Sequence, residues 1–436
     1  MKKKLLPALI VTGLIILVVI IMGITALINK YTPTKKTEDL KEYFNISSDD
    51  EVALIVDNEL SDYKAKIIDK KIYVDYKFVH DSLNSRFYWD ANENVLLYTT
   101  ASDIISAAAD SNSYSVTKQT NDFGYPIVKA TSDSALIALD YVKQYSNITF
   151  KSYDDPARIV ITSKWDEIDS ATVSKSTQVR VKGGIKSPIL KEVKKDDKIT
   201  ILDSGDKWDK VATEDGVIGY IKRKALSESK KTKLTNPDYE EETFTHIKKD
   251  KDICLAWNQV TSQSANSKVP QVISSTKGIN VMSPTWFYLN DNNGNLADIA
   301  SKDYVSYCHS QGIEVWGLFS NFENTDVDAA YVLTHTSTRT TLINQIMSAA
   351  FNYELDGVNI DFENITEAAY GDSYIEFIRE LAIKCHNNGI SLSVDVTVPA
   401  SFNKFFNRSD MANFADYIVI MGYDEHYKGS DAGSVS

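Results

Sequence analysis

Residues 356–363 read DGVNIDFE, and this stretch decides the fold of the carboxyl-terminal part of the chain. In a strand, alternate side chains point to opposite faces, so its apolar residues share one face. Asn359, Asp361 and Glu363 then share the other face. Buried carboxylates are costly unless they are paired, hydrogen-bonded or used in chemistry. The pattern therefore predicts a buried strand whose polar face carries a functional group of side chains.

A repeated order of strand and helix surrounds this stretch. Strand followed by helix, repeated, requires parallel strands with crossover helices. We therefore expect a (β/α)8 TIM-type barrel over 249–436, with its reactive residues at the carboxyl ends of the strands. Such barrels have about 250 residues, so this one is expected to be truncated after its sixth strand, as a fragment of a longer chain would be. The candidate strands are DICLAWNQV, GINVMSPTWFYL, IEVWGLFSN, LDGVNIDFE, ISLSVDVTVP and DYIVIMGYD.

Two motifs in this region carry a family resemblance. DGVNIDFE resembles the Asp-Gly-x-Asp-x-Asp-x-Glu signature of glycoside hydrolase family 18, the chitinase-type barrels. MGYDEH, at 421–426, is similar to the Met-x-Tyr-Asp motif of the same family. The asparagine at the middle position and a neighbouring wall-type module resemble the spore-cortex-lytic branch, whose members are N-acetylglucosaminidases acting on peptidoglycan. Chitin or chitooligosaccharide remains the alternative substrate.

The resemblance implies a role for each motif residue. Glu363 would be the general acid, and Asp361 would orient the substrate acetamido group during retaining, substrate-assisted cleavage of β-1,4 bonds next to N-acetylglucosamine. Tyr423 would bind the acetyl oxygen. Asn359 stands where the family usually has aspartate, which we expect to leave Asp361 more plainly ionised, so that Asn359→Asp shifts the pH–rate profile. Further residues expected to bind substrate, where the tryptophans could equally be packing residues, are Asp424, Trp257, Trp286, Trp316 and Met421.

The amino-terminal residues 1–30 predict a membrane anchor. A basic triplet precedes an uncharged apolar run from Leu5 to Ile28, which as a helix would reach roughly 36 Å and exceed a hydrocarbon core of about 30 Å. The run is longer than a cleavable signal and lacks a small-x-small site, so an uncleaved anchor is favoured over a cleaved leader. The lysines predict a cytoplasmic amino terminus and an extracellular remainder.

Three segments separate the anchor from the barrel. Residues 31–50 are a polar spacer. Residues 51–168 contain two passes of a strand, helix and two-strand pattern, which resembles the small α+β domain called copper amine oxidase amino-terminal-like, without implying copper chemistry. Residues 169–228 have short alternating strands between Gly- and Asp-rich turns, and this all-β pattern is similar to a bacterial Src-homology-3-like domain. Such a domain could bind the wall or serve as a spacer. A charged linker over 229–248 follows.

Composition excludes some functions. The net charge is −13, and an acidic surface repels nucleic acid. The three cysteines, Cys254, Cys308 and Cys385, are far apart in apolar contexts, which predicts buried free thiols. The histidines do not cluster with them, so neither a metal nor another cofactor is expected. The expected partners are wall glycan or chitooligosaccharide and the membrane. A different class of function, a non-catalytic wall-binding protein with a decayed or truncated barrel, remains open.

Overall fold

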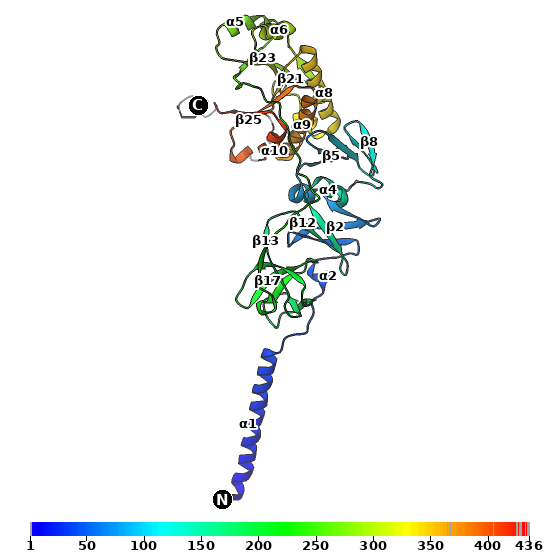
Figure 1. The fold of residues 1–436 in the computed structure, drawn as a ribbon, viewed down its shortest axis with the longest axis vertical. Coiled ribbons are helices and arrows are strands. Elements are labelled where there is room, and N and C mark those ends of the chain that lie inside the picture. The colour runs from blue at the N-terminus through cyan, green and yellow to red at the C-terminus, as the bar shows by residue number, and fades with distance from the viewer. Residues whose placement is uncertain are drawn as a thin grey trace. The chain divides into compact units, whose positions relative to one another are not determined.

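Two compact units make up the chain (Figure 1). Unit 1 is Met1–Asp75 with Val142–Glu240, and unit 2 is Tyr76–Tyr141 with Glu241–Ser436. The α+β segment expected over 51–168 is therefore divided between the two units. The computed structural model describes residues 2–363, 365, 368–403, 405–423, 426, 430–431 and 433.

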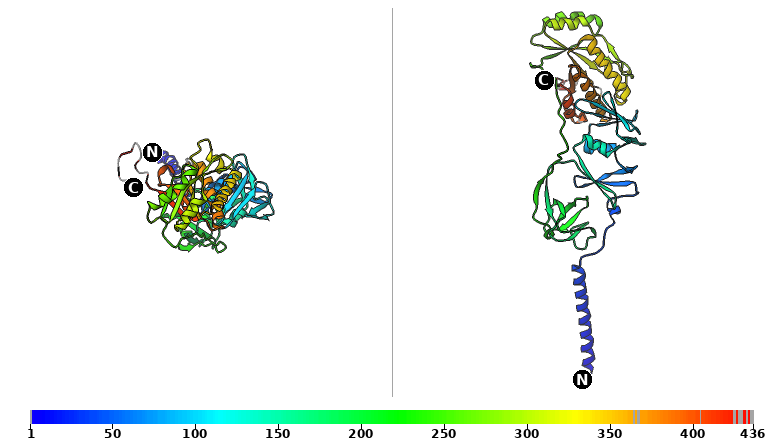
Figure 2. Two further views of the ribbon diagram at one scale, coloured as in Figure 1. Left: turned by 90° about the horizontal axis from the view of Figure 1, so that it is seen from above. Right: turned by 45° about the vertical axis from the view of Figure 1, so that its right-hand side comes forward.

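Unit 1 begins with the long helix α1 (Lys2–Tyr31) (Figure 2). Its segment Leu9–Tyr31 has a mean hydropathy of 2.9 and exposed side chains, and among the described residues it is the one helix long and apolar enough to cross a membrane. A helix of this length rises about 35 Å, against a hydrocarbon core of about 30 Å. By length and composition α1 is thus able to span a bilayer.

The rest of unit 1 is mainly β structure. After the short helix α2 (Leu40–Tyr43), one sheet has the order β11-β12-β1-β2-β3 within this unit, with β1 parallel to β12. The second sheet is antiparallel throughout, in the order β15-β14-β18-β17-β16-β13-β19. The strands that unit 1 contributes to the first sheet are β1 (Glu51–Val56), β2 (Glu59–Ile68), β3 (Lys71–Asp75), β11 (Thr149–Tyr153) and β12 (Arg158–Thr162). The second consists of β13 (Glu167–Thr172), β14 (Thr177–Arg180), β15 (Ile189–Val193), β16 (Lys198–Asp203), β17 (Trp208–Thr213), β18 (Ile218–Lys222) and β19 (Lys230–Lys233), and the 3-10 turn η2 (Arg223–Ala225) follows β18.

Unit 2 contains the parallel sheet that the sequence predicts. Its order is β20-β21-β23-β24-β25-β26, and every neighbouring pair is parallel. Each of the six candidate strands contains one of these strands, so their positions and their parallel pairing are confirmed. The strands are β20 (Leu255–Asn258), β21 (Val281–Leu289), β23 (Glu314–Ser320), β24 (Gly357–Asp361), β25 (Ser391–Thr397) and β26 (Tyr417–Met421), and β22 (Leu296–Asp298) pairs antiparallel with β21.

Helices cover one face of the parallel sheet (Figure 2). The two longest, α8 (Thr336–Tyr353) and α9 (Ala368–His386), pack against β24 and β25 respectively. Val358 and Ile360 of β24 are fully buried on this side. The remaining helices of this region are η3 (Gln263–Lys268), α5 (Val269–Ser274), α6 (Lys302–Ser310), α7 (Ala329–Thr334), η4 (Ser401–Asn403) and α10 (Arg408–Phe414).

Residues 76–141 belong to unit 2, and the antiparallel meander that they contain packs on these helices. Asp90 Oδ2 accepts hydrogen bonds from the backbone N–H of Thr336 at 2.7 Å and from its hydroxyl at 2.6 Å. A carboxylate at the first turn of a helix satisfies free N–H groups and complements the helix dipole. The meander therefore caps α8. It consists of β4 (Phe87–Asp90), β5 (Val95–Thr99), β6 (Ile104–Ala108), β7 (Ser113–Val116) and β8 (Gln119–Asp122), flanked by α3 (Tyr76–Phe78), η1 (Val79–Leu83), the hairpin β9 (Val128–Ala130) and β10 (Ala135–Ala138), and α4 (Leu139–Tyr145).

Buried ion pairs hold α8, α9 and α10 together beneath the meander. Arg339 is fully buried and its Nε donates to Glu380 Oε1 at 2.9 Å. Arg379 donates to Glu376 at 2.9 Å and also pairs with Asp410. The hydroxyl of Thr99 completes the group by donating to Glu376 Oε1 at 2.8 Å. Because buried charges need partners, this network fixes which helix faces meet.

The cysteines differ in part from the sequence expectation. All three are free thiols, and Cys308 and Cys385 are buried as predicted. Cys254 is exposed, so the prediction is wrong for this residue. It lies just before β20, where the chain enters the sheet from its edge, and an apolar sequence context there does not lead to burial.

Candidate active site

The polar side chains of strand β24 point to the face of the sheet opposite α8. Asn359 lies opposite Leu318 of β23 and Ser393 of β25, and Asp361 lies opposite Ser320. Gly357 begins the strand because a Cβ there would come within 2.6 Å of the Trp316 ring. The strand thus carries its polar groups toward its carboxyl end, where parallel barrels place their chemistry.

Asn359 connects four strands through one fully buried side-chain amide. Its Oδ1 accepts hydrogen bonds from Trp257 Nε1 at 3.0 Å and from Ser283 Oγ at 2.9 Å. Its Nδ2 donates to Asp395 Oδ1 at 2.8 Å. These partners come from β20, β21 and β25. Both ends of the amide are therefore occupied, and its orientation is fixed.

Half-buried Asp361 and buried Asp395 place two carboxyl groups near this amide. Among the described residues, neither Asp361 Oδ1 nor Asp395 Oδ2 has a hydrogen-bond partner. Burial, followed by the negative charges of Asp395, Glu363 and Glu323, raises the pKa of Asp361 to about 8. Burial raises the pKa of Asp395 to about 7, although the hydrogen bond from Asn359 opposes this shift. Both carboxyl groups therefore hold their protons to a higher pH than exposed aspartates do, chiefly because burial disfavours the charged form.

This finding overturns the expected ionisation of Asp361. The asparagine at 359 does remove one carboxylate from the strand, but Asp395 of β25 supplies a like charge from the neighbouring strand. Burial above all, and then this like charge, raise the pKa of Asp361, so this carboxyl is less readily ionised near neutral pH than the sequence predicts.

Glu363 follows the end of β24 and is exposed to solvent. Its backbone N–H donates to Asn321 Oδ1 at 3.1 Å, which anchors the turn after the strand. A cavity of about 20 Å³, room for about one water molecule, adjoins it. The cavity is lined by Phe362, Glu363, Tyr374, Asp395, Val396, Thr397, Phe406 and Met421. Glu363 thus stands where solvent, or a ligand, meets the two carboxyl groups.

Two aromatic rings form a rim above the amide. The Trp257 and Tyr423 rings lie edge to face with centroids 6.1 Å apart. Trp257 is 37% exposed and Tyr423 is 49% exposed. Half-exposed aromatic faces beside carboxyl groups are suited to packing against a sugar ring, because the faces are apolar and the rims of both side chains can form hydrogen bonds.

Two of the predicted substrate-binding tryptophans lie in the hydrophobic core. Trp286 is fully buried, donates to Asn266 Oδ1 at 2.8 Å, and packs on Tyr304. Trp316 is also fully buried, and its indole donates to Glu314 Oε2 at 3.0 Å.

Both rings are therefore placed in the core rather than at the rim. Met421 lines the small cavity next to Glu363. Asp424 lies outside the described residues.

Asp395 is the main site residue that the sequence reasoning missed. It lies in SLSVDVT, where Ser391, Ser393 and Asp395 alternate with apolar residues. That alternation is the same signal as in DGVNIDFE and marks a polar inner face. Ser283 and Glu323 were missed as well. Among the described residues, no group of three or more His, Cys, Asp or Glu side chains could hold a metal ion.

The carboxyl-terminal part of the chain is similar to known proteins. Residues 318–435 match the model of Glycosyl hydrolases family 18. The chain is 24% identical over 160 residues to "Uncharacterized glycosylase YvbX" of Bacillus subtilis (strain 168), covering 34% of this chain and 45% of that protein. It is 31% identical over 109 residues to "Putative sporulation-specific glycosylase YdhD" of the same organism, covering 24% and 26%. The chain thus spans less than half the length of these curated relatives.

A solved structure is also similar. The Bacillus megaterium QM B1551 spore cortex-lytic enzyme SleL has a TM-score of 0.35 and 18% identity, with 42% of this chain and 43% of that chain covered. The matched segment 318–435 contains β24, with Asn359 and Asp361, together with Glu363 and Asp395. Residues 318–435 are therefore similar to glycosyl hydrolases of family 18.

Proposed function

We propose that this chain is a membrane-anchored, extracytoplasmic glycosidase that cleaves β-1,4 bonds next to N-acetylglucosamine in cell-wall glycan. The observation that carries the proposal is the group at the end of β24. Exposed Glu363 lies two residues after Asp361 and lines a small cavity with buried Asp395, and the rings of Trp257 and Tyr423 lie at the rim. An acid at the surface, with carboxyl groups of raised pKa behind it, suits a reaction that develops positive charge on a sugar.

The proposed reaction is retaining and uses the acetamido group of the substrate as nucleophile. Glu363 donates its proton to the glycosidic oxygen while the acetamido oxygen attacks the anomeric carbon and the bond to the leaving sugar breaks. The resulting oxazolinium ion is positively charged. Water then attacks the same carbon, gives its proton to Glu363 and reopens the ring, so that the acid is restored.

Asp361 stabilises the oxazolinium ion in this proposal. Its protonated form suits the empty site, and a cation beside it favours ionisation. Asp395 can hold the proton, since its pKa of about 7 is close to that of Asp361. Asn359 fixes the geometry of Asp395, and Tyr423 binds the acetyl oxygen. Asp424 and Met421 remain proposed contacts to the sugar.

Peptidoglycan is the proposed substrate, with chitooligosaccharide as the alternative. The names of the relatives support a wall glycan, since one is called a sporulation-specific glycosylase and another a spore cortex-lytic enzyme. Both glycans contain the 2-acetamido sugar that the reaction requires. In the sequence, the segment 51–168 and the proposed Src-homology-3-like domain at 169–228 lie between α1 and the proposed barrel.

Helix α1 is the proposed anchor. Its segment Leu9–Tyr31 can cross a bilayer, and Lys2, Lys3 and Lys4 precede it. Basic residues favour the cytoplasmic side, so the remainder of the chain would lie outside. This location brings the barrel to the compartment that contains wall glycan.

The proposal is tested with matched glycans that differ only in N-acetylation. The full chain, in detergent, is incubated with peptidoglycan strands, with chitooligosaccharide, and with each glycan after de-N-acetylation, and the products are measured by mass spectrometry. Cleavage of an acetylated glycan and loss of cleavage after de-N-acetylation are expected. Binding of acetylated glycan without cleavage would favour the non-catalytic wall-binding alternative instead.

A further inference from the structure

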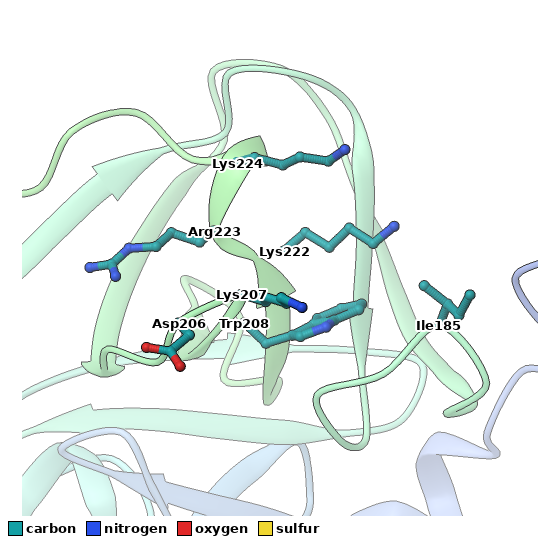
Figure 3. A pocket seen from close by; sticks show the side chains of 7 residues that line it. All are labelled: Ile185, Asp206, Lys207, Trp208, Lys222, Arg223 and Lys224. Atoms are coloured by element: carbon teal, nitrogen blue, oxygen red, sulfur yellow. The ribbon is translucent and has the colours of Figure 1, made fainter. Parts of the chain in front are cut away.

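A basic groove opens on the all-β module of unit 1 (Figure 3). The groove has a volume of about 540 Å³ and is positively charged, since four of its lining residues are basic and one is acidic. The whole chain, by contrast, has a net charge of −13. The lining residues are Ile185, Asp206, Lys207, Trp208, Lys222, Arg223 and Lys224.

Three of the basic side chains are available for an anionic ligand. In the described part of the chain, Lys207, Lys222 and Lys224 have no ion-pair partner, whereas Arg223 donates to Gly205 O at 3.1 Å. Figure 3 shows Lys222 and Lys224 extending in the same direction above Trp208, with Arg223 pointing the other way. Lys222 Nζ lies 5.7 Å from the centroid of the Trp208 ring. The groove thus combines an aromatic floor with unpaired ammonium groups.

The rim of this groove is tied to the residues that follow α1. Ile185, which lines the groove, accepts a hydrogen bond through its carbonyl from the N–H of Thr34 at 2.8 Å. The next residue, Lys186, donates from Nζ to the carbonyls of Thr32, at 2.7 Å, and Asn29. These contacts hold the rim against the last turn of the helix and the residues directly after it.

The loop that carries the rim also packs directly on the groove floor. A Cβ at Gly183 would lie 3.2 Å from Trp208 Cβ and 3.3 Å from Cγ, so glycine lets the loop approach this closely without displacing the tryptophan. The loop is therefore hydrogen-bonded to the residues that follow α1 and also packs against Trp208. A ligand in the groove would therefore lie close to the point where the helix ends.

We infer that the groove binds the phosphates of anionic phospholipid headgroups in the bilayer that α1 crosses. The inference rests on the proposed role of α1 as a membrane anchor. Tryptophan and lysine are the residue types that anchor proteins at the membrane interface. Lysines near an anionic membrane surface are attracted to it, and this attraction is screened by salt. Three unpaired lysines beside the end of the membrane helix thus suit an anionic headgroup.

The test measures contact between Trp208 and lipid in the full chain. The chain is reconstituted into nanodiscs of phosphatidylcholine alone or mixed with phosphatidylglycerol, in each case with lipids brominated near the headgroup. The difference in fluorescence quenching between the wild type and Trp208→Phe isolates this one ring among the six tryptophans. We expect quenching of Trp208 with phosphatidylglycerol at low salt, and its loss at high salt and with phosphatidylcholine alone.

Two triple variants separate the groove from general surface charge. Lys207→Gln/Lys222→Gln/Lys224→Gln is expected to abolish the quenching of Trp208. The matched control removes three lysines from the exposed strand β19 of the same module, Lys230→Gln/Lys231→Gln/Lys233→Gln, and is expected to retain it. Equal quenching in the two triple variants, or in both lipids, would overturn the inference.

Two further outcomes would also count against it. If soluble poly(glycerol phosphate) protects Trp208 from a soluble quencher while phosphatidylglycerol discs leave Trp208 unquenched, the groove binds a free polyanion and not the bilayer. Flotation of the protein with liposomes tests the anchor separately. Failure to float would contradict both the anchor and this inference, whereas flotation without lipid quenching of Trp208 would contradict the inference alone.

Discussion

At the scale of single residues, the amide of Asn359 controls how charge is distributed in the site. Its oxygen is occupied by Trp257 and Ser283, and its nitrogen donates to Asp395. An aspartate at the same position would add a third carboxyl group and remove that donor. The neighbouring negative charge that raises the pKa of Asp361 on β24 therefore comes from Asp395 on β25 rather than from position 359 of the same strand.

Replacing Asp395 tests this pair directly. Asp395→Asn removes a like charge, so the pKa of Asp361 should fall from about 8 toward its usual range, leaving the effect of burial. Carbon-13 NMR of labelled aspartate carboxyls would follow the titration. Asn359→Asp is the opposing variant and should raise the pKa values of the pair. An unchanged titration of Asp361 in Asp395→Asn would contradict the pairing.

Replacing Glu363 tests the proposed acid. Glu363→Gln keeps the shape of the side chain but cannot donate the proton, so kcat should fall by about 10²–10⁴-fold. Glycan binding should be retained. Glu354→Gln, an exposed change at the end of α8, is the matched control and should leave kcat unchanged. Wild-type kcat in Glu363→Gln would show that Glu363 is not the general acid.

Sequence reasoning reached only part of this site, for a physical reason. The polar face of one strand can be predicted from alternation, which is how Asn359, Asp361 and Glu363 were identified. Contact between Asp395 and Asn359 depends on the register of β24 against β25, and register is a tertiary property. Trp286 shows the same limit, because its position near a strand end did not reveal that it packs on Tyr304.

At the scale of elements, the β4–β5 hairpin acts as the cap of α8. Asp90 accepts from Thr336, and Glu93 accepts from the N–H of Ser337 at 3.1 Å. The position before Thr336 is His335, whose side chain makes no capping bond. The meander therefore supplies a cap that the helix lacks in its own sequence.

Removing that cap should loosen the first turn of α8. Asp90→Ala should cost about 2 kcal/mol and quicken amide exchange over 336–340 by about 30-fold. Hydrogen exchange measured by mass spectrometry would detect this local change. Asp133→Ala, at an exposed turn of the same unit, is the control and should not alter exchange there. Equal protection of α8 in Asp90→Ala and the wild type would show that the cap is dispensable.

The elements themselves were largely predictable where the local pattern is strong. All six parallel strands lie within the predicted segments, because β-rich apolar runs bounded by helical patterns determine strand type locally. The docking of the meander onto α8 and α9 was not predictable. It depends on polar contacts such as that between Thr99 and Glu376, which are far apart in the sequence.

At the scale of the whole molecule, the two carboxyl groups of raised pKa make stability depend on pH. Asp361 and Asp395 have raised pKa values in the folded state, so between about pH 4 and their folded pKa values the folded state binds more protons than the unfolded state. Their stabilising contribution is therefore present at low pH and is lost as the pH rises through about 7 to 8.

The melting temperature of unit 2 should accordingly fall between pH 5.5 and pH 8.5. A loss of 1 kcal/mol corresponds to about 2–4 °C for a domain of this size. Differential scanning calorimetry of the full chain in detergent would measure this. The double variant Asp361→Asn/Asp395→Asn should show a flatter dependence on pH. A wild-type melting temperature that rises over this range would contradict the raised pKa values.

The configuration of the first product is the most direct test of the proposed reaction. Proton NMR of a freshly started digestion of peptidoglycan strands or chitooligosaccharide distinguishes the two anomers before they interconvert. Attack by the acetamido group followed by water inverts the anomeric carbon twice, so the β-anomer should form first. Initial release of the α-anomer, or no cleavage of either glycan, would contradict substrate-assisted hydrolysis at the group formed by Asp361, Glu363 and Asp395.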